Sequence, residues 1–306
     1  MVIASFCTDE NVVWIFKRPR LIKVIILTVV SLIGMTPSLV AAVDLKASPL
    51  VIAHRGGRQW APENTLAAFR KSVDLGADGI ELDIHRCKTG ELIVIHDEEV
   101  DRTTDGSGFI KDLTLAQLRQ LSAGAKWAPA SQLRKLSAGI PYSSEFKHEK
   151  LPLLTEVFDL VRGKLLINIE IKNAPVDYPG IEDDLIALLK SYPYPDKIVV
   201  SSFDHDVVHR FHEKAPQYKC AILTDCILSD VGAYAKRVGA DNWNPGFGDF
   251  RGDAAERAHK AGLKVNVWTV NSPAEWKSAI NMPVDGIITD DPEGLMSFLK
   301  SESKRN

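Results

Sequence analysis

The sequence predicts an α/β fold, a (β/α)8 TIM barrel with a small insertion after the second strand and an N-terminal signal segment. Short apolar, β-branched runs alternate with amphipathic segments, as in repeated strand-helix units. Without its first 42 residues, the 306-residue chain keeps the length of a typical barrel, ~250 residues. The composition, 45% hydrophobic and 25% charged, is that of a globular protein. We therefore expect one barrel domain over residues 43–306.

Residues 1–42 have the pattern of a signal peptide. Residues 24–35 form a nearly unbroken apolar run, and residues 40–42 are small residues at cleavage-site spacing. A basic flank precedes the run: Lys17, Arg18, Arg20 and Lys23. The pattern predicts export, to the periplasm or out of the cell. Because residues 24–42 are just long enough to span a bilayer, a membrane anchor with the domain facing outside is the alternative.

Eight apolar runs are candidates for the parallel strands. In chain order they are residues 51–54, 79–84, 164–171, 197–201, 218–223, 240–243, 263–269 and 286–289. Helical patterns follow the first, third, fourth and fifth of these runs, at residues 64–75, 181–191, 204–214 and 230–238. The number of runs fits a closed barrel.

A ninth run, residues 91–95, must pair differently. Only a turn at residues 88–90 separates it from the second strand, and a parallel crossover needs a dozen or more residues. It therefore folds back as an antiparallel hairpin, with opposite residues whose numbers sum to about 178. This register places His96 beside Leu82.

Residues 113–151 fit no repeat of the barrel. They are mixed in Gly, Pro, Ser and Lys, and a helical pattern at residues 154–161 follows them. We expect a small helical or loop cap over the barrel mouth. Three cysteines remain after the signal segment, and Cys220 and Cys226 are either bridged or free thiols.

Carboxylates near the strand ends predict a metal site. Glu81 and Asp83 are two apart and point to one face of their strand, and Glu170 and Lys172 repeat this spacing. A divalent cation is the usual way to keep close, buried carboxylates ionised, and hard oxygen ligands favour Mg²⁺ or Ca²⁺. The alternative is a buried salt-bridge network or a solvated face. Their position at C-terminal strand ends, where barrels build active sites, favours the metal.

Two histidines lie beside these carboxylates. His54 closes the first strand and precedes Arg55, whose fork-shaped cation suits phosphate. The hairpin brings His96 next to the carboxylate pair. Two imidazoles there can act as general base and general acid in phosphodiester cleavage, although either could instead ligate the metal. The formal net charge of −3 gives no attraction to nucleic acid, and we expect no such partner.

At these positions the sequence resembles the glycerophosphodiester phosphodiesterase family, in order from about residue 51 to residue 297. The motifs are His54-Arg55-Gly56, residues 62–65, 76–83, His96-Asp97, residues 101–104, 170–172, Ser202-Phe203, residues 268–271 and 288–292. Thr89 and Cys87 depart from the family pattern, in which Asp and Thr are common. Both lie at the hairpin tip, so we expect effects on the loop and not on the chemistry.

The resemblance implies a TIM barrel and a role for each matching residue. It implies that the enzyme binds one divalent cation, Mg²⁺ or Ca²⁺, and that other matching residues catalyse the reaction or contact the substrate. The metal ligands are Glu81, Asp83 and Glu170, the acid/base pair is His54 and His96, and the phosphate contacts are Arg55 and Lys172. Trp268 lies where the family has an aromatic residue near the glycerol end, or it packs within the barrel.

The expected reaction is hydrolysis of a small-molecule glycerophosphodiester to sn-glycerol 3-phosphate and an alcohol. One alternative is a lysophospholipid-cleaving phosphodiesterase on the same scaffold, for which an apolar surface near residues 127–141 would be the sign. Another is a non-catalytic secreted barrel that binds phosphodiesters. The retention of both His54 and His96 argues for an enzyme, because binding alone needs only the cations and the metal.

Overall fold

The computed structural model describes residues 48–129, 142–248 and 250–304, which belong to one compact unit. The expected signal segment lies outside the described residues, as do residues 130–141 of the expected insertion. The assignment of residues 1–42 as a signal peptide, with its membrane-anchor alternative, and that of residues 43–306 as the domain remain predictions. None of the described helices is both long and apolar enough to cross a bilayer.

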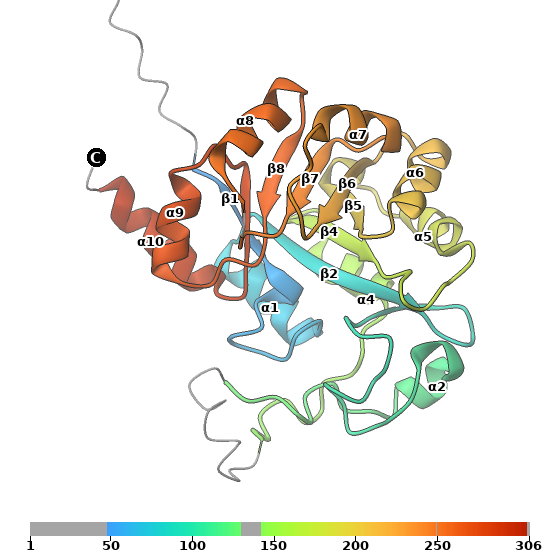
Figure 1. The fold of residues 1–306 in the computed structure, drawn as a ribbon. Helices are drawn as coiled ribbons and strands as arrows, with labels where there is room; N and C mark the ends of the chain where they lie inside the picture. The colour runs from blue at the N-terminus through green and yellow to red at the C-terminus, as the bar shows by residue number, and fades with distance from the viewer. Residues whose placement is uncertain (1–47, 130–141, 249, 305–306) are drawn as a thin grey trace, which may run out of the picture. The chain divides into compact units, whose positions relative to one another are not determined.

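The strands form a closed barrel, as predicted (Figure 1). Eight strands are parallel to their neighbours, and β1 closes the ring by pairing with both β2 and β9. They are β1 (Leu50–Ala53), β2 (Gly79–Arg86), β4 (Leu166–Ile171), β5 (Ile198–Ser202), β6 (Lys219–Thr224), β7 (Asn242–Pro245), β8 (Lys264–Val267) and β9 (Gly286–Thr289). Each matches one of the eight predicted runs.

Helices cover the outside of the barrel. The longer ones are α1 (Leu66–Leu75), α4 (Leu154–Val161), α5 (Ile181–Leu189), α6 (His205–Lys214), α7 (Val231–Val238), α8 (Gly252–Lys260), α9 (Pro273–Ile280) and α10 (Pro292–Ser303). Their apolar faces pack against the outward residues of the strands and form the main hydrophobic core. The first five match predicted helical segments. α8, α9 and α10 were not among them.

The ninth strand, β3 (Leu92–Val94), pairs antiparallel with β2, as expected. Ile84 lies opposite Val94 and His85 opposite Ile93, so the predicted register is confirmed. At the hairpin tip the Glu91 carboxylate accepts hydrogen bonds from the Cys87 thiol and the Thr89 hydroxyl. The two departures from the family pattern therefore stabilise the turn together.

The described residues between β3 and α4 form a small lobe, which holds η2 (Ile110–Asp112) and α2 (Leu115–Leu118). The described part of this lobe has its own hydrophobic cluster: Cys87, Ile93, Ile95, Val100, Ile110, Leu118, Ala123 and Leu151. Separately, the cysteines after the signal segment are free: Cys87 and Cys220 are buried and Cys226 is exposed, so the alternative of free thiols holds.

Candidate active site

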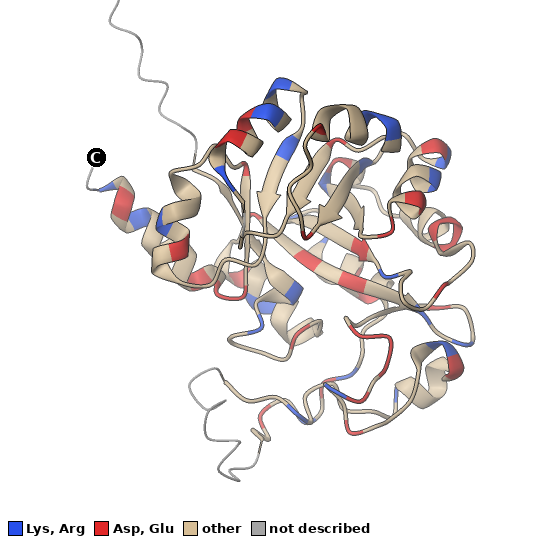
Figure 2. Cartoon of the chain, viewed as in Figure 1, with Lys and Arg blue, Asp and Glu red and all other residues tan. Residues whose placement is uncertain are grey.

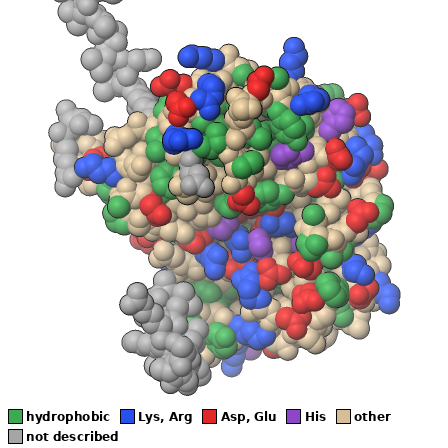
Figure 3. All heavy atoms as spheres, viewed as in Figure 1, with side chains coloured by type: hydrophobic (Ala, Val, Ile, Leu, Met, Phe, Trp, Pro, Cys, Tyr) green, Lys and Arg blue, Asp and Glu red, His purple; other side chains and the backbone are tan. Residues whose placement is uncertain are grey.

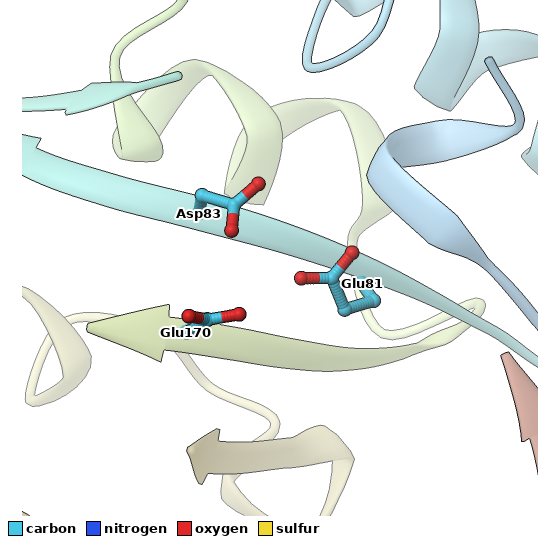
Figure 4. Close-up of side chains that lie close together, drawn as sticks. All are labelled: Glu81, Asp83 and Glu170. Atoms are coloured by element: carbon cyan, nitrogen blue, oxygen red, sulfur yellow. The ribbon is translucent and has the colours of Figure 1, made fainter. Parts of the chain in front are cut away.

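Three carboxylates meet at the mouth of the barrel. Glu81 and Asp83 extend from β2 and Glu170 from β4, and all three are buried (Figure 4). One oxygen of each lies within 4.8 Å of the others. Figure 2 shows acidic residues on β2. The register explains the meeting, because Asp83 pairs with Glu170 across the two parallel strands. The predicted cluster is thus formed.

The cluster carries more negative charge than its surroundings balance. Burial and then repulsion from Asp83 and Glu170 raise the pKa of Glu81 well above its usual value. Burial likewise raises the pKa of Glu170. Burial acts the same way on Asp83, but the cations of Lys172 and Arg55 outweigh it and lower the pKa of that group. Hard oxygen donors that resist joint ionisation fit a divalent cation.

Lys172 and Asn64 hold the carboxylates in place. Lys172 Nζ lies 3.1 Å from Asp83 Oδ1 and 2.5 Å from Glu170 Oε1. The Asn64 side-chain amide donates to Asp83 Oδ2 at 2.8 Å. Lys172 is therefore at the site, as the resemblance implied, and here it binds two of the carboxylates.

A strained turn at η1 (His54–Gly56) brings Arg55 to the cluster. Arg55 has φ 49°, a left-handed conformation that costs a bulky residue about 1–3 kcal/mol. This conformation lets the Arg55 backbone N–H donate a hydrogen bond to Glu81 Oε2 at 2.9 Å, which offsets part of the strain. Its guanidinium binds Glu63 Oε1 at 2.7 Å. Gly56 follows with φ 82°, and a Cβ there would lie 2.8 Å from Ala68 Cβ.

His54 lies between the cluster and an aspartate. Its Nδ1 is 2.6 Å from Asp290 Oδ1, and its Nε2 is 3.9 Å from Glu81 Oε2. Burial lowers the pKa of His54 despite the hydrogen bond to Asp290. Asn271 donates to the second oxygen of Asp290 at 2.8 Å. The ring is thereby fixed with Nε2 directed toward the carboxylates.

His96, like His54, has an aspartate as the partner of its Nδ1 atom. Its Nδ1 lies 2.6 Å from Asp97 Oδ1, and Arg102 donates to Asp97 Oδ2 at 2.5 Å. Arg102 also donates to both oxygens of Glu63, at 2.7 and 3.0 Å. Since Glu63 binds Arg55, a continuous chain of ion pairs joins the His96 side of the mouth to the Arg55 side.

Trp268 and Phe203 form an aromatic wall at the mouth. Their rings meet edge to face, with centroids 5.6 Å apart, and the Trp268 indole N–H donates to the Asn244 carbonyl at 2.8 Å. Both line a cavity of about 60 Å³ together with the two histidines and Glu170. Figure 3 shows basic, acidic and histidine side chains gathered on this part of the surface.

All eight predicted site residues thus lie at one mouth. Sequence reasoning gave no role to four others that hold them: Glu63, Asn64, Arg102 and Asp290. The sequence did contain a signal for Asp290. His54 and Asp290 directly follow β1 and β9, which are neighbouring strands of the barrel. Neighbouring parallel strands place such residues side by side. All four lie within the family motifs, as does Asp97 next to His96, but the resemblance implied no role for any of them.

The fold and the mouth together define a TIM barrel with a candidate active site at the C-terminal ends of its strands. The family model of the glycerophosphoryl diester phosphodiesterase family matches residues 54–294. A glycerophosphodiester phosphodiesterase of Caldanaerobacter subterraneus is 42% identical over 252 residues, which cover 82% of this chain and 98% of that protein. A Bacillus subtilis protein of the same name is 31% identical over 300 residues, covering 90% and 97% of the two chains.

Solved structures agree with these relatives. An Oleispira antarctica phosphodiesterase, in complex with the product sn-glycerol-3-phosphate, aligns with a TM-score of 0.70 at 26% identity, over 83% of this chain and 97% of that one. A glycerophosphodiester phosphodiesterase of Agrobacterium tumefaciens aligns with a TM-score of 0.66 at 26% identity, over 80% and 97%. The chain belongs to the glycerophosphoryl diester phosphodiesterase family, as the sequence motifs implied, and it is an enzyme.

Proposed function

We propose that the chain hydrolyses glycerophosphodiesters to sn-glycerol 3-phosphate and an alcohol, with one divalent cation and a pair of histidines. The observation that carries this proposal is the meeting of three buried carboxylates with two histidines and two cations at one mouth. The product named for the Oleispira antarctica relative supports the same substrate class.

The carboxylates Glu81, Asp83 and Glu170 would hold Mg²⁺ or Ca²⁺. When bound, the cation would neutralise phosphate charge and lower the pKa of an attacking hydroxyl. Arg55 and Lys172 border the same space and would bind the phosphate oxygens, because both carry fixed positive charge beside the cluster. Lys172 would exchange part of its contact with the carboxylates for the phosphate.

His54 and His96 would move the protons. In each ring an aspartate binds Nδ1, so Nε2 is the atom left to accept or give a proton. One histidine removes a proton from the nucleophile and the other protonates the leaving alkoxide. The nucleophile is water, or the glycerol 2-hydroxyl through a cyclic phosphate that water then opens. Trp268 would pack against the glycerol carbons.

The alcohol group would leave the site through a second cavity, of about 460 Å³, which adjoins the site at Asp290. Its lining is mixed: Arg58, Arg102 and Lys126 are charged, whereas Trp127, Ala128 and Tyr142 are apolar or aromatic. The charged residues favour a polar head group, and the apolar ones favour the lysophospholipid alternative. Export by residues 1–42 would place the reaction in the periplasm or outside the cell.

The test is release of sn-glycerol 3-phosphate from glycerophosphocholine by the full chain. We expect release that a chelator stops and that Mg²⁺ or Ca²⁺ restores. Glu170→Gln, which keeps the size of the side chain, should lose most of the metal response. As a matched control, Glu182→Gln changes a buried carboxylate on α5, where it pairs with Arg210. Release only from lysophospholipids would favour the alternative.

A further inference from the structure

His85 continues the series of inward side chains on β2. It follows Glu81 and Asp83 at the same spacing of two, so its side chain leaves the strand on the same face. It is 2% exposed. Buried polar groups in proteins are nearly always hydrogen-bonded, so the partners of this imidazole indicate its role.

Both ring nitrogens of His85 have a partner. Nε2 lies 2.9 Å from the backbone oxygen of His96, and Nδ1 lies 3.0 Å from the Tyr178 hydroxyl. Because a carbonyl oxygen only accepts, Nε2 is the nitrogen that donates, which in the neutral ring leaves Nδ1 to accept from Tyr178. With both nitrogens engaged, His85 acts through the residues that it binds and not on a metal ion or on substrate.

The bond to His96 holds the peptide group between a histidine and its aspartate. The backbone pairing of the hairpin extends to the bond from the Ile95 N–H to the Asp83 carbonyl, at 3.0 Å. The chain then leaves the sheet, and the His96 carbonyl belongs to the peptide that joins His96 to Asp97. The two side chains extend from either side of this peptide and meet at 2.6 Å. A bond that fixes the peptide oxygen therefore restrains both of them.

Tyr178 extends the connection to a second loop of the mouth. It is 3% exposed, lies between β4 and α5, and its ring meets that of His85 edge to face with centroids 5.6 Å apart. Its backbone N–H donates to Asn173 Oδ1 at 2.7 Å, and Asn173 directly follows Lys172. His85 thus joins the segment that carries His96 to the loop that begins beside Lys172.

We propose that His85 is a positioning residue for His96, which it links through Tyr178 to the loop after Lys172. This inference rests on the proposed function, in which the His96 ring moves a proton. Proton transfer needs the ring within hydrogen-bond reach of the reacting oxygen, and a displacement of about 1 Å can cost about 100-fold in rate. His85 restrains His96 from the barrel side, while Asp97 and Arg102 restrain it from the lobe side.

The test is steady-state kinetics of His85→Leu with glycerophosphocholine and a divalent cation. Leucine fills the space of the imidazole and removes both hydrogen bonds. We expect kcat to fall about 10- to 100-fold, with KM changed less than about twofold. His85→Gln should recover most of kcat, because its amide can donate to the His96 carbonyl and its oxygen can accept from Tyr178. An unchanged kcat in folded His85→Leu, or a rise in KM alone, would overturn the proposal.

A double-mutant cycle separates positioning from general damage. When His96 is already alanine, His85→Leu should cost less than about twofold in kcat, because the ring that it positions is absent. Losses that simply multiply would show that His85 acts on another group, and would overturn the proposal.

The matched control is His205→Leu. His205 also joins a tyrosine hydroxyl to a backbone carbonyl, with Tyr234 at 2.7 Å and the Leu223 oxygen at 2.8 Å, but that carbonyl belongs to a residue without a reacting group. We expect kcat to stay within about twofold. A loss equal to that of His85→Leu would count against a specific role for His85.

Failure of the proposed function gives a different result. Near wild-type turnover in His96→Ala would remove His96 from the mechanism, whereas loss of turnover in His96→Ala but not in His85→Leu would reject only the positioning role. If His85→Leu does not fold, Tyr178→Phe tests the same path by removing one hydroxyl. We expect kcat to fall about two- to fivefold, and an unchanged kcat in this variant would overturn the proposal.

Discussion

His54 and His96 approach the carboxylate cluster from different parts of the chain with the same local arrangement. Each imidazole has an aspartate 2.6 Å from Nδ1, and each aspartate has a second partner, Asn271 for Asp290 and Arg102 for Asp97. Such partners fix the orientation of a ring and the nitrogen that exchanges protons. The two rings are therefore held ready before substrate binds.

Loss of either ring should remove most of the turnover. We expect His54→Ala and His96→Ala each to lower kcat about 10²–10⁴-fold, the usual contribution of a positioned acid or base. Release of sn-glycerol 3-phosphate measures the effect, and circular dichroism shows whether the fold is kept. Near wild-type turnover in a folded variant would remove that histidine from the mechanism.

Asp290 is a positioning residue, and its effect should fall on kcat. Asp290→Asn keeps the shape but weakens the hold on His54 Nδ1, so we expect kcat to fall about 10- to 100-fold with little change in KM. Steady-state kinetics with glycerophosphocholine separates the two constants. A rise in KM alone would assign Asp290 to substrate binding. Asp285→Asn, far from the mouth, is a control of the same chemistry.

At the scale of elements, the sequence predicted the strands better than the helices. All eight parallel strands and the register of the hairpin are confirmed, because buried β-branched runs and a short turn leave few alternatives. α8 was missed because its buried face consists of alanines, which give a weak apolar period. α9 and α10 begin with Pro273 and Pro292 after capping residues, a start signal that was available.

Site residues at or near strand ends could be predicted from the sequence, and those in loops could not. The carboxylates, histidines and cations could be predicted because they lie at or near strand ends, where the spacing of two fixes their direction. Glu63 and Arg102 could not be placed, because both lie in loops whose path depends on packing with the lobe. Their contact appears only when the loop after β1 and the loop after β3 meet.

The turn after β1 depends on a glycine. We expect Gly56→Ala to destabilise the fold by about 2–4 kcal/mol, because φ 82° disfavours alanine and its Cβ would collide with Ala68. Gly90→Ala is the matched control, with φ 101° and open space around it, and should cost only about 1 kcal/mol. Thermal melting of both variants gives the comparison. Equal losses would show that the collision is relieved at no cost.

For the whole molecule, the carboxylate cluster couples metal binding to stability. A cation that binds the folded chain raises its stability, by about 2.7 kcal/mol at a concentration of 100 times Kd. We therefore expect Mg²⁺ or Ca²⁺ to raise Tm. Glu81→Gln should abolish this shift and also raise the Tm in chelator, because it removes a buried charge that its neighbours repel. A metal-induced shift that persists in the variant would place the cation elsewhere.

The lobe between β3 and α4 has a hydrophobic cluster of its own, and β3, which leads into it, contributes Ile93 to that cluster and Leu92 and Val94 to the main core. The eight-stranded ring closes without it. His96 lies two residues after β3, and its partner Asp97 is bound by Arg102 of the lobe, so the orientation of one half of the acid/base pair depends on the lobe. Partial opening of the lobe would therefore inactivate an otherwise folded enzyme. On heating, we expect turnover to disappear reversibly several degrees below the loss of ellipticity, and coincident transitions would show that lobe and barrel melt as one cooperative unit.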